Sequence, residues 1–278
     1  MSTSNNSLRD FSGTLVLVGA GKMGGAMLDG WLALGLDPAK VAIQEPQPAA
    51  GIAALKDRGV RINPAAASVG DASVIVIAVK PQVAAEVVPG LRTLLRPGTV
   101  AVSVMAGKTL GFLESALGPG CAIVRSIPNT PAAIGRGITV AVPNGKVTAG
   151  QRTLADTLLG SVGTVEWVDD EGLIDAATAV SGSGPAYVFL LAEGLARAGA
   201  AAGLPADLAA RLARATVAGS GELLHRSPLD AATLRQNVTS PAGTTAAALG
   251  VLMAGDGLDP LLAKAVAAAT KRSKELAG

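Results

Sequence analysis

Three closely spaced glycines are the part of this sequence best suited to binding a charged ligand. Gly19, Gly21 and Gly24 form the pattern GxGxxG directly after the apolar run 15–18. In a dinucleotide-binding turn the first glycine permits the turn, the second lets the backbone approach a pyrophosphate, and the third lets a helix pack close to a strand. The first N–H groups of that helix would face the phosphates. We predict a cofactor-binding turn made of Gly19, Ala20, Gly21, Lys22, Met23 and Gly24.

The residues that end later apolar runs are further candidates, because ligands of open α/β sheets bind beyond the carboxyl ends of the strands. Glu45 ends the second run, where a carboxylate would accept hydrogen bonds from the ribose of NADH and repel the 2′-phosphate of NADPH. Alternatively, Glu45 points into solvent, or the cations Lys22, Lys56 or Arg58 compensate for its charge. Lys80 either reaches a ribose or phosphate oxygen or is a solvated loop lysine.

Asn129 follows a further apolar run and lies between two prolines, 128 and 131. Such a rigid backbone suits a group that positions a nicotinamide, and it equally suits an ordinary turn. The predicted cofactor contacts outside the glycine turn are Glu45, Ala78, Val79, Lys80, Pro81, Met105, Ala106, Gly107 and Asn129. Together these residues predict that NADPH or NADH binds at one edge of a sheet.

Two segments in the C-terminal half, 181–187 and 237–245, break the rules of a continuous helix. The second strings an amide and several hydroxyls across a helix start. A helix start with uncapped N–H groups and hydroxyls binds carboxylates well, so this segment could hold an acidic substrate. The alternative is that Thr239 or Ser240 only caps a helix beginning at Pro241. That alternative gives Thr244 and Thr245 no role.

The elements that must position these residues fall into two groups. Apolar runs alternate with helical patterns up to about residue 165, which predicts a Rossmann-like, doubly wound sheet. The predicted strands are 15–18, 40–44, 72–79, 99–105, 122–127, 138–142 and 164–168, and the main helices between them are 48–58, 81–91, 109–117 and 148–159. From residue 170 the chain is alanine-rich and predicts only helices, at 173–180, 185–202, 205–225, 230–236, 241–254 and 258–276.

We therefore predict an α/β protein with a dinucleotide-binding domain, 1–169, and an all-helical C-terminal domain, 170–278, that binds substrate and forms the dimer. The helical half has a high apolar fraction for short helices packed alone, so we expect it to bury surface against a second subunit. A net charge of +2 and 2% aromatic residues argue against a nucleic-acid partner.

The sequence also predicts a cytoplasmic protein without a membrane partner. No apolar run is long enough to span a bilayer, and the polar N-terminus lacks the apolar core of a signal peptide. The single cysteine, Cys121, suits a reducing compartment and is interpreted as a small apolar residue entering a strand. We predict no metal site, and the one histidine, His225, is interpreted as structural.

At these motifs the chain resembles the pyrroline-5-carboxylate reductases over essentially its whole length. The segments that carry the resemblance are GAGKMG (19–24), AVKPQ (78–82), VSVMAG (102–107), SIPNTP (126–131), SGSGPAYVF (181–189) and NVTSPAGTT (237–245). The resemblance implies reduction of L-1-pyrroline-5-carboxylate to L-proline by NADPH or NADH. It also implies a homo-oligomer, an intertwined dimer that can assemble further into a ring of dimers, a decamer. Ala242 departs from the family, where many members have glycine.

Matched by position, the family's substrate contacts fall on Asn237, Gly243, Thr244 and Thr245. A cyclic imine can enter already protonated and accept hydride directly, whereas a carbonyl substrate usually needs an acid to protonate the alkoxide. The shortage of acids here therefore favours an imine, and Thr245 is the expected catalytic residue, through a hydrogen bond near the ring nitrogen.

Two alternatives remain. A β-hydroxyacid dehydrogenase has a similar turn and a helical second domain, but it needs a lysine on the first long interdomain helix. Val188 lies where that lysine would fall, and no lysine occurs between Lys146 and Lys264. A non-catalytic dinucleotide-sensing protein would need only the N-terminal half, and the intact polar segments of the C-terminal half argue against it.

Overall fold

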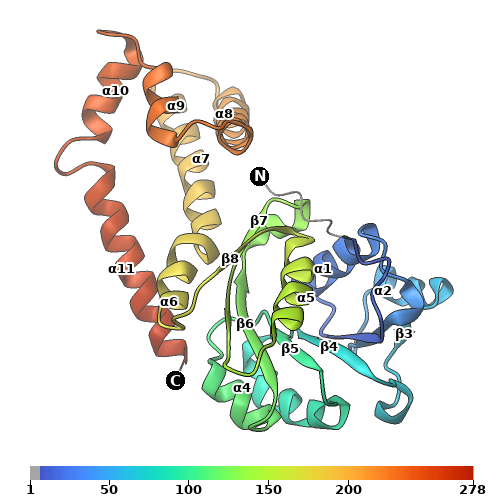
Figure 1. Ribbon diagram of the computed structural model, residues 1–278. Coiled ribbons are helices and arrows are strands. Elements are labelled where there is room, and N and C mark those ends of the chain that lie inside the picture. Colours follow the sequence, from blue (N-terminus) through green and yellow to red (C-terminus); the bar gives the residue numbers. More distant parts are fainter. Residues whose placement is uncertain (1–6, 278) are drawn as a thin grey trace. The chain divides into compact units, whose positions relative to one another are not determined.

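The computed structural model describes residues 7–277; residues 1–6, where the predicted polar N-terminus begins, and residue 278 lie outside it. Residues 14–167 form an eight-stranded sheet in the order β3-β2-β1-β4-β5-β6-β7-β8 (Figure 1). The strands are β1 (Thr14–Val18), β2 (Val41–Gln44), β3 (Arg61–Ile62), β4 (Ala72–Ile77), β5 (Val100–Ser103), β6 (Ala122–Pro128), β7 (Gly137–Pro143) and β8 (Gly163–Trp167). The first six are mutually parallel.

Both faces of this sheet are buried, which explains its continuous apolar runs. Along β4, Val74 and Val76 join one buried cluster, and Ile75 and Ile77 join the other. Side chains of a strand alternate between the two faces, so a run without polar residues is expected only where both faces are covered. The prediction of a Rossmann-like α/β sheet is confirmed.

Helices supply the two covering layers. Those before residue 178 are α1 (Lys22–Ala33), α2 (Ala50–Ala54), α3 (Ala84–Val87), α4 (Leu110–Leu117), α5 (Ala149–Gly160) and α6 (Leu173–Ala177). Two predicted helices are broken. The segment 48–58 contains α2 and a 3₁₀ turn, Leu55–Arg58. The segment after Pro81 is α3 between two stretches of 3₁₀ helix, because Pro89 has no N–H to continue an α-helical ladder.

Two features of the sheet were not predicted. Strand β3 has two residues, too few for a periodic pattern to be recognised. Strand β7 runs antiparallel to β6, while β8 runs parallel to β7. The connection from β6 to β7 holds only a short 3₁₀ turn, Thr130–Ile134, and no crossover helix, so the chain must return in the opposite direction.

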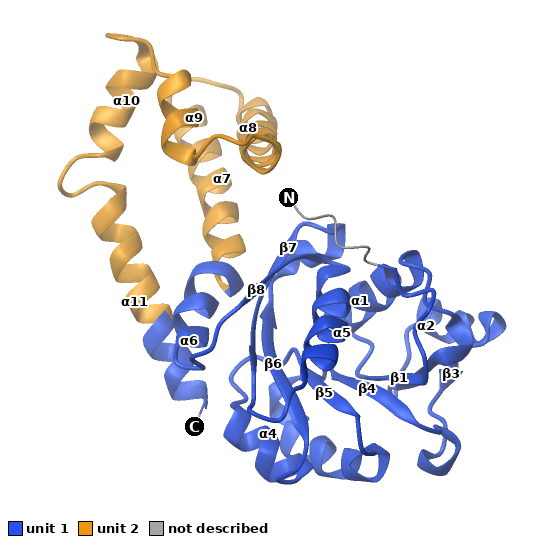
Figure 2. Cartoon of the chain, viewed as in Figure 1, with its two compact units in different colours: residues 1–182, 270–278 blue, residues 183–269 orange. Residues whose placement is uncertain are grey.

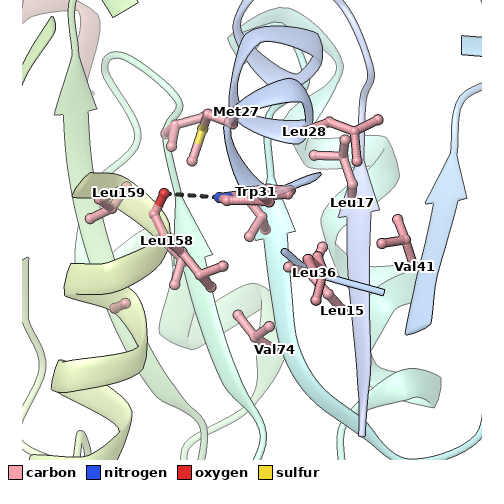
Figure 3. Packing of buried hydrophobic residues seen from close by; sticks show 14 of the residues in the cluster. Leu15, Leu17, Met27, Leu28, Trp31, Leu36, Val41, Val74, Leu158 and Leu159 are labelled. Atoms are coloured by element: carbon pink, nitrogen blue, oxygen red, sulfur yellow. Dashed lines mark hydrogen bonds between the residues drawn. The ribbon is translucent and has the colours of Figure 1, made fainter. Parts of the chain in front are cut away.

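Trp31 joins α1 to α5. Its side chain is fully buried, and its indole Nε1 donates to the backbone oxygen of Leu158 on α5, 2.9 Å away. Figure 3 shows the ring among apolar side chains of β1 and β4, with Leu158 beside it. This contact therefore fixes α1, and with it the predicted glycine turn, against the sheet.

The chain divides into two compact units (Figure 2). One contains the sheet, residues up to 182 and the last turns of the chain from residue 270, and the other spans 183–269. The C-terminal helices are α7 (Gly184–Ala201), α8 (Ala206–Arg226), α9 (Ala231–Asn237), α10 (Thr244–Leu252) and α11 (Leu258–Ala277). The end of α11 is tied to α6, where Ser273 Oγ donates to Asp175 Oδ1 at 2.6 Å.

The helical unit leaves many large apolar side chains on its surface, including four consecutive residues of α7 from Val188 to Leu191. A patch of this kind on a monomer is typical of a protein–protein interface. Among residues 7–277, no helix combines the length and the hydropathy that a membrane span needs.

We predict that Trp31→Phe lowers the free energy of unfolding by about 2–3 kcal/mol, because it removes a buried hydrogen bond and leaves a cavity. The matched control is Trp167→Phe on the edge strand β8, where the partly exposed indole donates to Asp156 Oδ1 at 2.8 Å. That change is expected to cost about 1 kcal/mol or less. Denaturant midpoints of the two variants measure the difference, and equal midpoints would contradict this account of the core.

Candidate cofactor and substrate sites

The three glycines after β1 each meet a different spatial demand. Gly19 has φ +89°, and a Cβ there would lie 2.7 Å from the backbone oxygen of Ala78. A Cβ on Gly24 would lie 2.2 Å from the oxygen of Gly19, so the first turn of α1 packs directly against the backbone that follows β1. A Cβ on Gly21 would meet no atom within 4 Å, which leaves open space above the turn. These are the three roles that a pyrophosphate-binding turn requires.

Helix α1 presents uncapped N–H groups at that open space. Its N-cap is Gly21, which supplies no side-chain hydrogen bond. The first N–H groups of a helix have no partner within it, and they carry the positive end of the helix dipole. The helix start can therefore hold a phosphate through the backbone of Lys22, Met23 and Gly24.

Glu45 is held over the same turn. Its carboxylate accepts hydrogen bonds from the N–H of Ala20 at 3.0 Å and the N–H of Gln47 at 3.1 Å. The alternative that Glu45 simply points into solvent is therefore wrong. Asn63 fixes its backbone, since the amide Nδ2 donates to the oxygen of Glu45 and Oδ1 accepts from its N–H, each at 2.8 Å. Asn63 adopts φ +50°, a left-handed conformation that asparagine tolerates better than most residues other than glycine.

A cavity of about 730 Å³ opens beside the glycine turn, at the carboxyl ends of β1, β2 and β4. The predicted residues that line it are Gly19, Gly21, Glu45, Ala78, Val79 and Lys80. Sequence reasoning missed Asn63, Glu86 and the apolar wall formed by Val87, Leu91 and Leu94. Val87 and Leu91 lie on the segment 81–91, predicted as a regular helix, and Leu94 follows that segment. Asn63 follows the unpredicted strand β3, so no pattern indicated these residues.

Five predicted cofactor residues outside the glycine turn, Pro81, Met105, Ala106, Gly107 and Asn129, are not part of the cavity lining. The side chain of Met105 packs in the core. Gly107 has φ +68°, and a Cβ there would lie 3.2 Å from the oxygen of Leu276 near the end of α11. The loop from Met105 to Gly107 therefore contacts the end of the chain.

Asn129 is buried and holds two backbone segments together. Its Oδ1 accepts from the N–H of Ile138 at 2.9 Å, and its Nδ2 donates to the oxygen of Ser181 at 3.1 Å. Ser181 belongs to a turn of π-helix, Thr178–Gly182, and is the first residue of the SGSGPAY motif. The side chain of Asn129 thus ties the strand ends to this motif.

In the helical unit, α10 begins at Thr244 with an uncapped start. Its N-cap, Gly243, supplies no side-chain hydrogen bond, and within residues 7–277 the hydroxyls of Thr244 and Thr245 make no hydrogen bond. The first N–H groups of α10 are also without helical partners. Asn237 is exposed at the end of α9. This arrangement offers several neutral donors to one anion.

The alternative that Thr239 or Ser240 caps a helix beginning at Pro241 is wrong. Helix α10 begins three residues later, and the hydroxyl of Thr239 donates back to the oxygen of Arg235 at 2.7 Å. Ala242 lies before the helix with φ +58°, a conformation that favours glycine. This conformation is a physical reason for the glycine that the resemblance implies at this position. The predicted helix 241–254 would have placed Ala242 in its first turn, and that part of the prediction is wrong.

Neither a reactive cysteine nor a cluster of metal ligands is found among the described residues. Burial raises the pKa of the Cys121 thiol to about 11, so this side chain stays protonated at neutral pH and is a poor nucleophile. Within residues 7–277 no three His, Cys, Asp or Glu side chains are grouped as metal ligands.

Comparison with known proteins identifies both halves of the chain. Residues 171–276 match the family model described as pyrroline-5-carboxylate reductase dimerisation, and residues 14–107 match the one described as NADP oxidoreductase, coenzyme F420-dependent. A pyrroline-5-carboxylate reductase of Pseudomonas aeruginosa is 40% identical over 95% of this chain and 96% of its own length. That of Pisum sativum is 39% identical over 95% and 96%.

Solved structures of pyrroline-5-carboxylate reductases resemble this chain over nearly its whole length. A pyrroline-5-carboxylate reductase of Coxiella burnetii superposes with a TM-score of 0.88 at 34% identity, over 96% of this chain and 99% of its own. A pyrroline carboxylate reductase of Plasmodium falciparum, solved with NADP bound, gives a TM-score of 0.78 at 29% identity, over 95% and 98%.

We predict that Gly21→Ala and Gly24→Ala separate binding from folding. Gly24→Ala is expected to lower the free energy of unfolding by about 3 kcal/mol, because its Cβ collides with backbone. Gly21→Ala is expected to leave it within about 1 kcal/mol and to raise the cofactor dissociation constant about tenfold or more, because its Cβ occupies the open space.

Gly25→Ala is the matched control. Its Cβ would lie 3.8 Å from the nearest atom, so it should stabilise the helix by about 0.5–1 kcal/mol and leave cofactor binding unchanged. Thermal unfolding and fluorescence titration with NADH and NADPH measure both quantities. Unchanged cofactor affinity in Gly21→Ala would contradict the assignment of the turn.

Proposed function

The chain belongs to the pyrroline-5-carboxylate reductase family, and from that premise we propose which of its residues hold each reactant and which cofactor it prefers. The reaction is the reduction of L-1-pyrroline-5-carboxylate to L-proline with NAD(P)H, the last step of proline biosynthesis. The observation that carries the residue assignment is the pair of uncapped helix starts, one after β1 and one at α10.

The glycine turn and the cavity beside it hold the dinucleotide. The uncapped N–H groups of α1 bind the pyrophosphate, and Gly21 lets it approach the backbone. Lys80 lines the cavity with an exposed ammonium group that can reach a ribose or phosphate oxygen. When bound, the cofactor supplies a hydride from the nicotinamide ring. Asn129, Pro81 and the loop from Met105 to Gly107 are proposed to position that ring.

The start of α10 holds the substrate carboxylate. The first N–H groups of the helix and the hydroxyl of Thr244 donate to it. The exposed amide of Asn237, at the end of α9, is proposed to donate as well. The hydroxyl of Thr245 is proposed to hydrogen-bond near the ring nitrogen. These groups orient the substrate without transferring a proton, because a protonated imine already accepts hydride at carbon.

The activity is tested by NAD(P)H oxidation in the presence of L-1-pyrroline-5-carboxylate. We expect Thr245→Val to lower kcat/KM about 10- to 100-fold, the loss typical of a hydrogen bond to a charged or reacting group. Thr245→Ser keeps the hydroxyl and should remain within a few-fold of the unaltered enzyme. A Thr245→Val enzyme with unaltered kinetic constants would remove the proposed role.

The cofactor cavity favours NADH over NADPH. The carboxylate of Glu45 is fixed by two backbone N–H groups and stands at the end of β2, where ribose hydroxyls would donate to it. A 2′-phosphate there would meet like charge from Glu45 and Glu86. The cations that could compensate, Lys22, Lys56 and Arg58, are exposed and do not line the cavity, and Lys80, which does line it, is one positive charge against the two carboxylates.

We expect Glu45→Ser to raise kcat/KM for NADPH relative to NADH by about tenfold or more, because it removes the fixed negative charge. Asp57→Asn is the matched control, since it removes one negative charge from an exposed turn outside the cavity. It should change the ratio by less than about twofold. A strong NADPH preference in the unaltered enzyme that survives Glu45→Ser would refute the assignment.

The enzyme is a homo-oligomer through its dimerisation domain, and we propose that dimers assemble further into a ring. The exposed apolar side chains of α7, α8 and α11 support the burial of further surface. We also propose a cytoplasmic location, which the free cysteine supports.

A further inference from the structure

A second cavity lies at the opposite edge of the sheet. Its volume is about 550 Å³, and its walls come from the loop before β5, the turn between α4 and β6, and the start of α5. Thr99 and Cys121, which precede β5 and β6, mark the amino ends of these parallel strands. The cofactor cavity opens at the carboxyl ends of the strands, so the two cavities are separate.

Positive charge dominates this second cavity. Arg92, Arg96 and Lys146 line it, and its lining contains no aspartate or glutamate. The thiol of Cys121 stays protonated because burial raises its pKa to about 11, so it adds no negative charge. The potential inside the cavity therefore comes from three cations without a carboxylate partner in the lining.

The two guanidinium groups are held by backbone oxygens. Arg92 donates from Nε to the oxygen of Ala116 and from Nη2 to that of Ser115, both at 2.6 Å. Arg96 donates from Nη1 to the oxygens of Thr93 and Leu95, at 3.0 and 2.8 Å. These bonds leave further N–H groups on each guanidinium, and they reduce the conformational entropy that binding would remove.

The opposite wall is also ordered. Gln151 donates from Nε2 to the oxygen of Gly98 at 2.9 Å and takes part in the capping box with Thr148 that begins α5. Two loops and a helix start are therefore held around one volume. The apolar side chains Leu95 and Leu117 complete the lining, so the cavity suits a small molecule that carries anionic groups on a compact apolar body.

We propose that this cavity is a second ligand site, which binds a small polyanion, an organic phosphate or a polycarboxylate, independently of the nicotinamide cofactor. Arg92, Arg96 and Lys146 bind the anionic groups. The 3₁₀ segment Val88–Leu94 lies between the two sites, since Leu91 and Leu94 line the cofactor cavity while Arg92 lines this one.

Calorimetric titration of the full-length enzyme, saturated with NADH and at low salt, tests this proposal with pyrophosphate and citrate as probes. Saturation with NADH keeps the probes out of the cofactor cavity. At least one probe should bind with one site per chain, and the tighter probe identifies the phosphate or carboxylate class. The double variant Arg96→Gln, Lys146→Gln should weaken that binding by on the order of tenfold or more, since it removes two charged contacts.

The matched control is Lys271→Gln, Lys274→Gln, which removes two exposed cations from α11. It should leave the dissociation constant of the probe within about twofold. The result that overturns the proposal is either no binding by the unaltered enzyme or the same weakening in both double variants, which would indicate general charge attraction. Failure of the pyrroline-5-carboxylate assay does not affect this test, because the probes are titrated without substrate.

Discussion

The close approach of α1 to β1 is the constraint on which the cofactor site depends. A Cβ on Gly24 would lie 2.2 Å from the oxygen of Gly19, so only the absence of a side chain lets the helix start lie directly over the strand end. That position directs the unpaired N–H groups of α1 toward the cavity beside the glycine turn. At the other end of the helix, the hydrogen bond from Trp31 to Leu158 holds α1 in this position. The buried core and the proposed phosphate site thus depend on the same helix.

Much of this arrangement could be predicted because its causes are local. The alternation of Val and Ile in β4 indicates a strand buried on both faces, and the glycine spacing indicates the turn. What could not be predicted depends on partners distant in sequence. Asn63 acquires its role only because β3 pairs with β2, 18 residues from Glu45, and a two-residue strand leaves no periodic signal.

The start of α10 is a second feature that the sequence predicted only in part. The hydroxyls of the segment 237–245 indicated an anion site, but their spacing suggested a helix that begins at Pro241. The helix instead begins at Thr244. Ala242 adopts φ +58°, which a right-handed helix cannot contain, so no helix runs continuously from Pro241. Turn conformations of this kind arise from backbone energetics that the residue types only bias. The anion site therefore stays a prediction, and only the predicted start of the helix at Pro241 is wrong.

The neutral character of that helix start has a consequence for the reaction. The segment 237–245 contains no charged side chain. A carboxylate could be held by arginine, but a guanidinium close to a protonated imine would repel its positive charge and raise the energy of the electrophile before hydride arrives. Hydroxyls and backbone N–H groups in the proposed site would hold the carboxylate with a smaller penalty, because a helix start carries only about half a positive charge, and their dipoles would need no reorganisation as the charge on the ring is neutralised. Neutral donors at the start of α10 are therefore better suited to an iminium substrate than the cationic clamps that many carboxylate sites use.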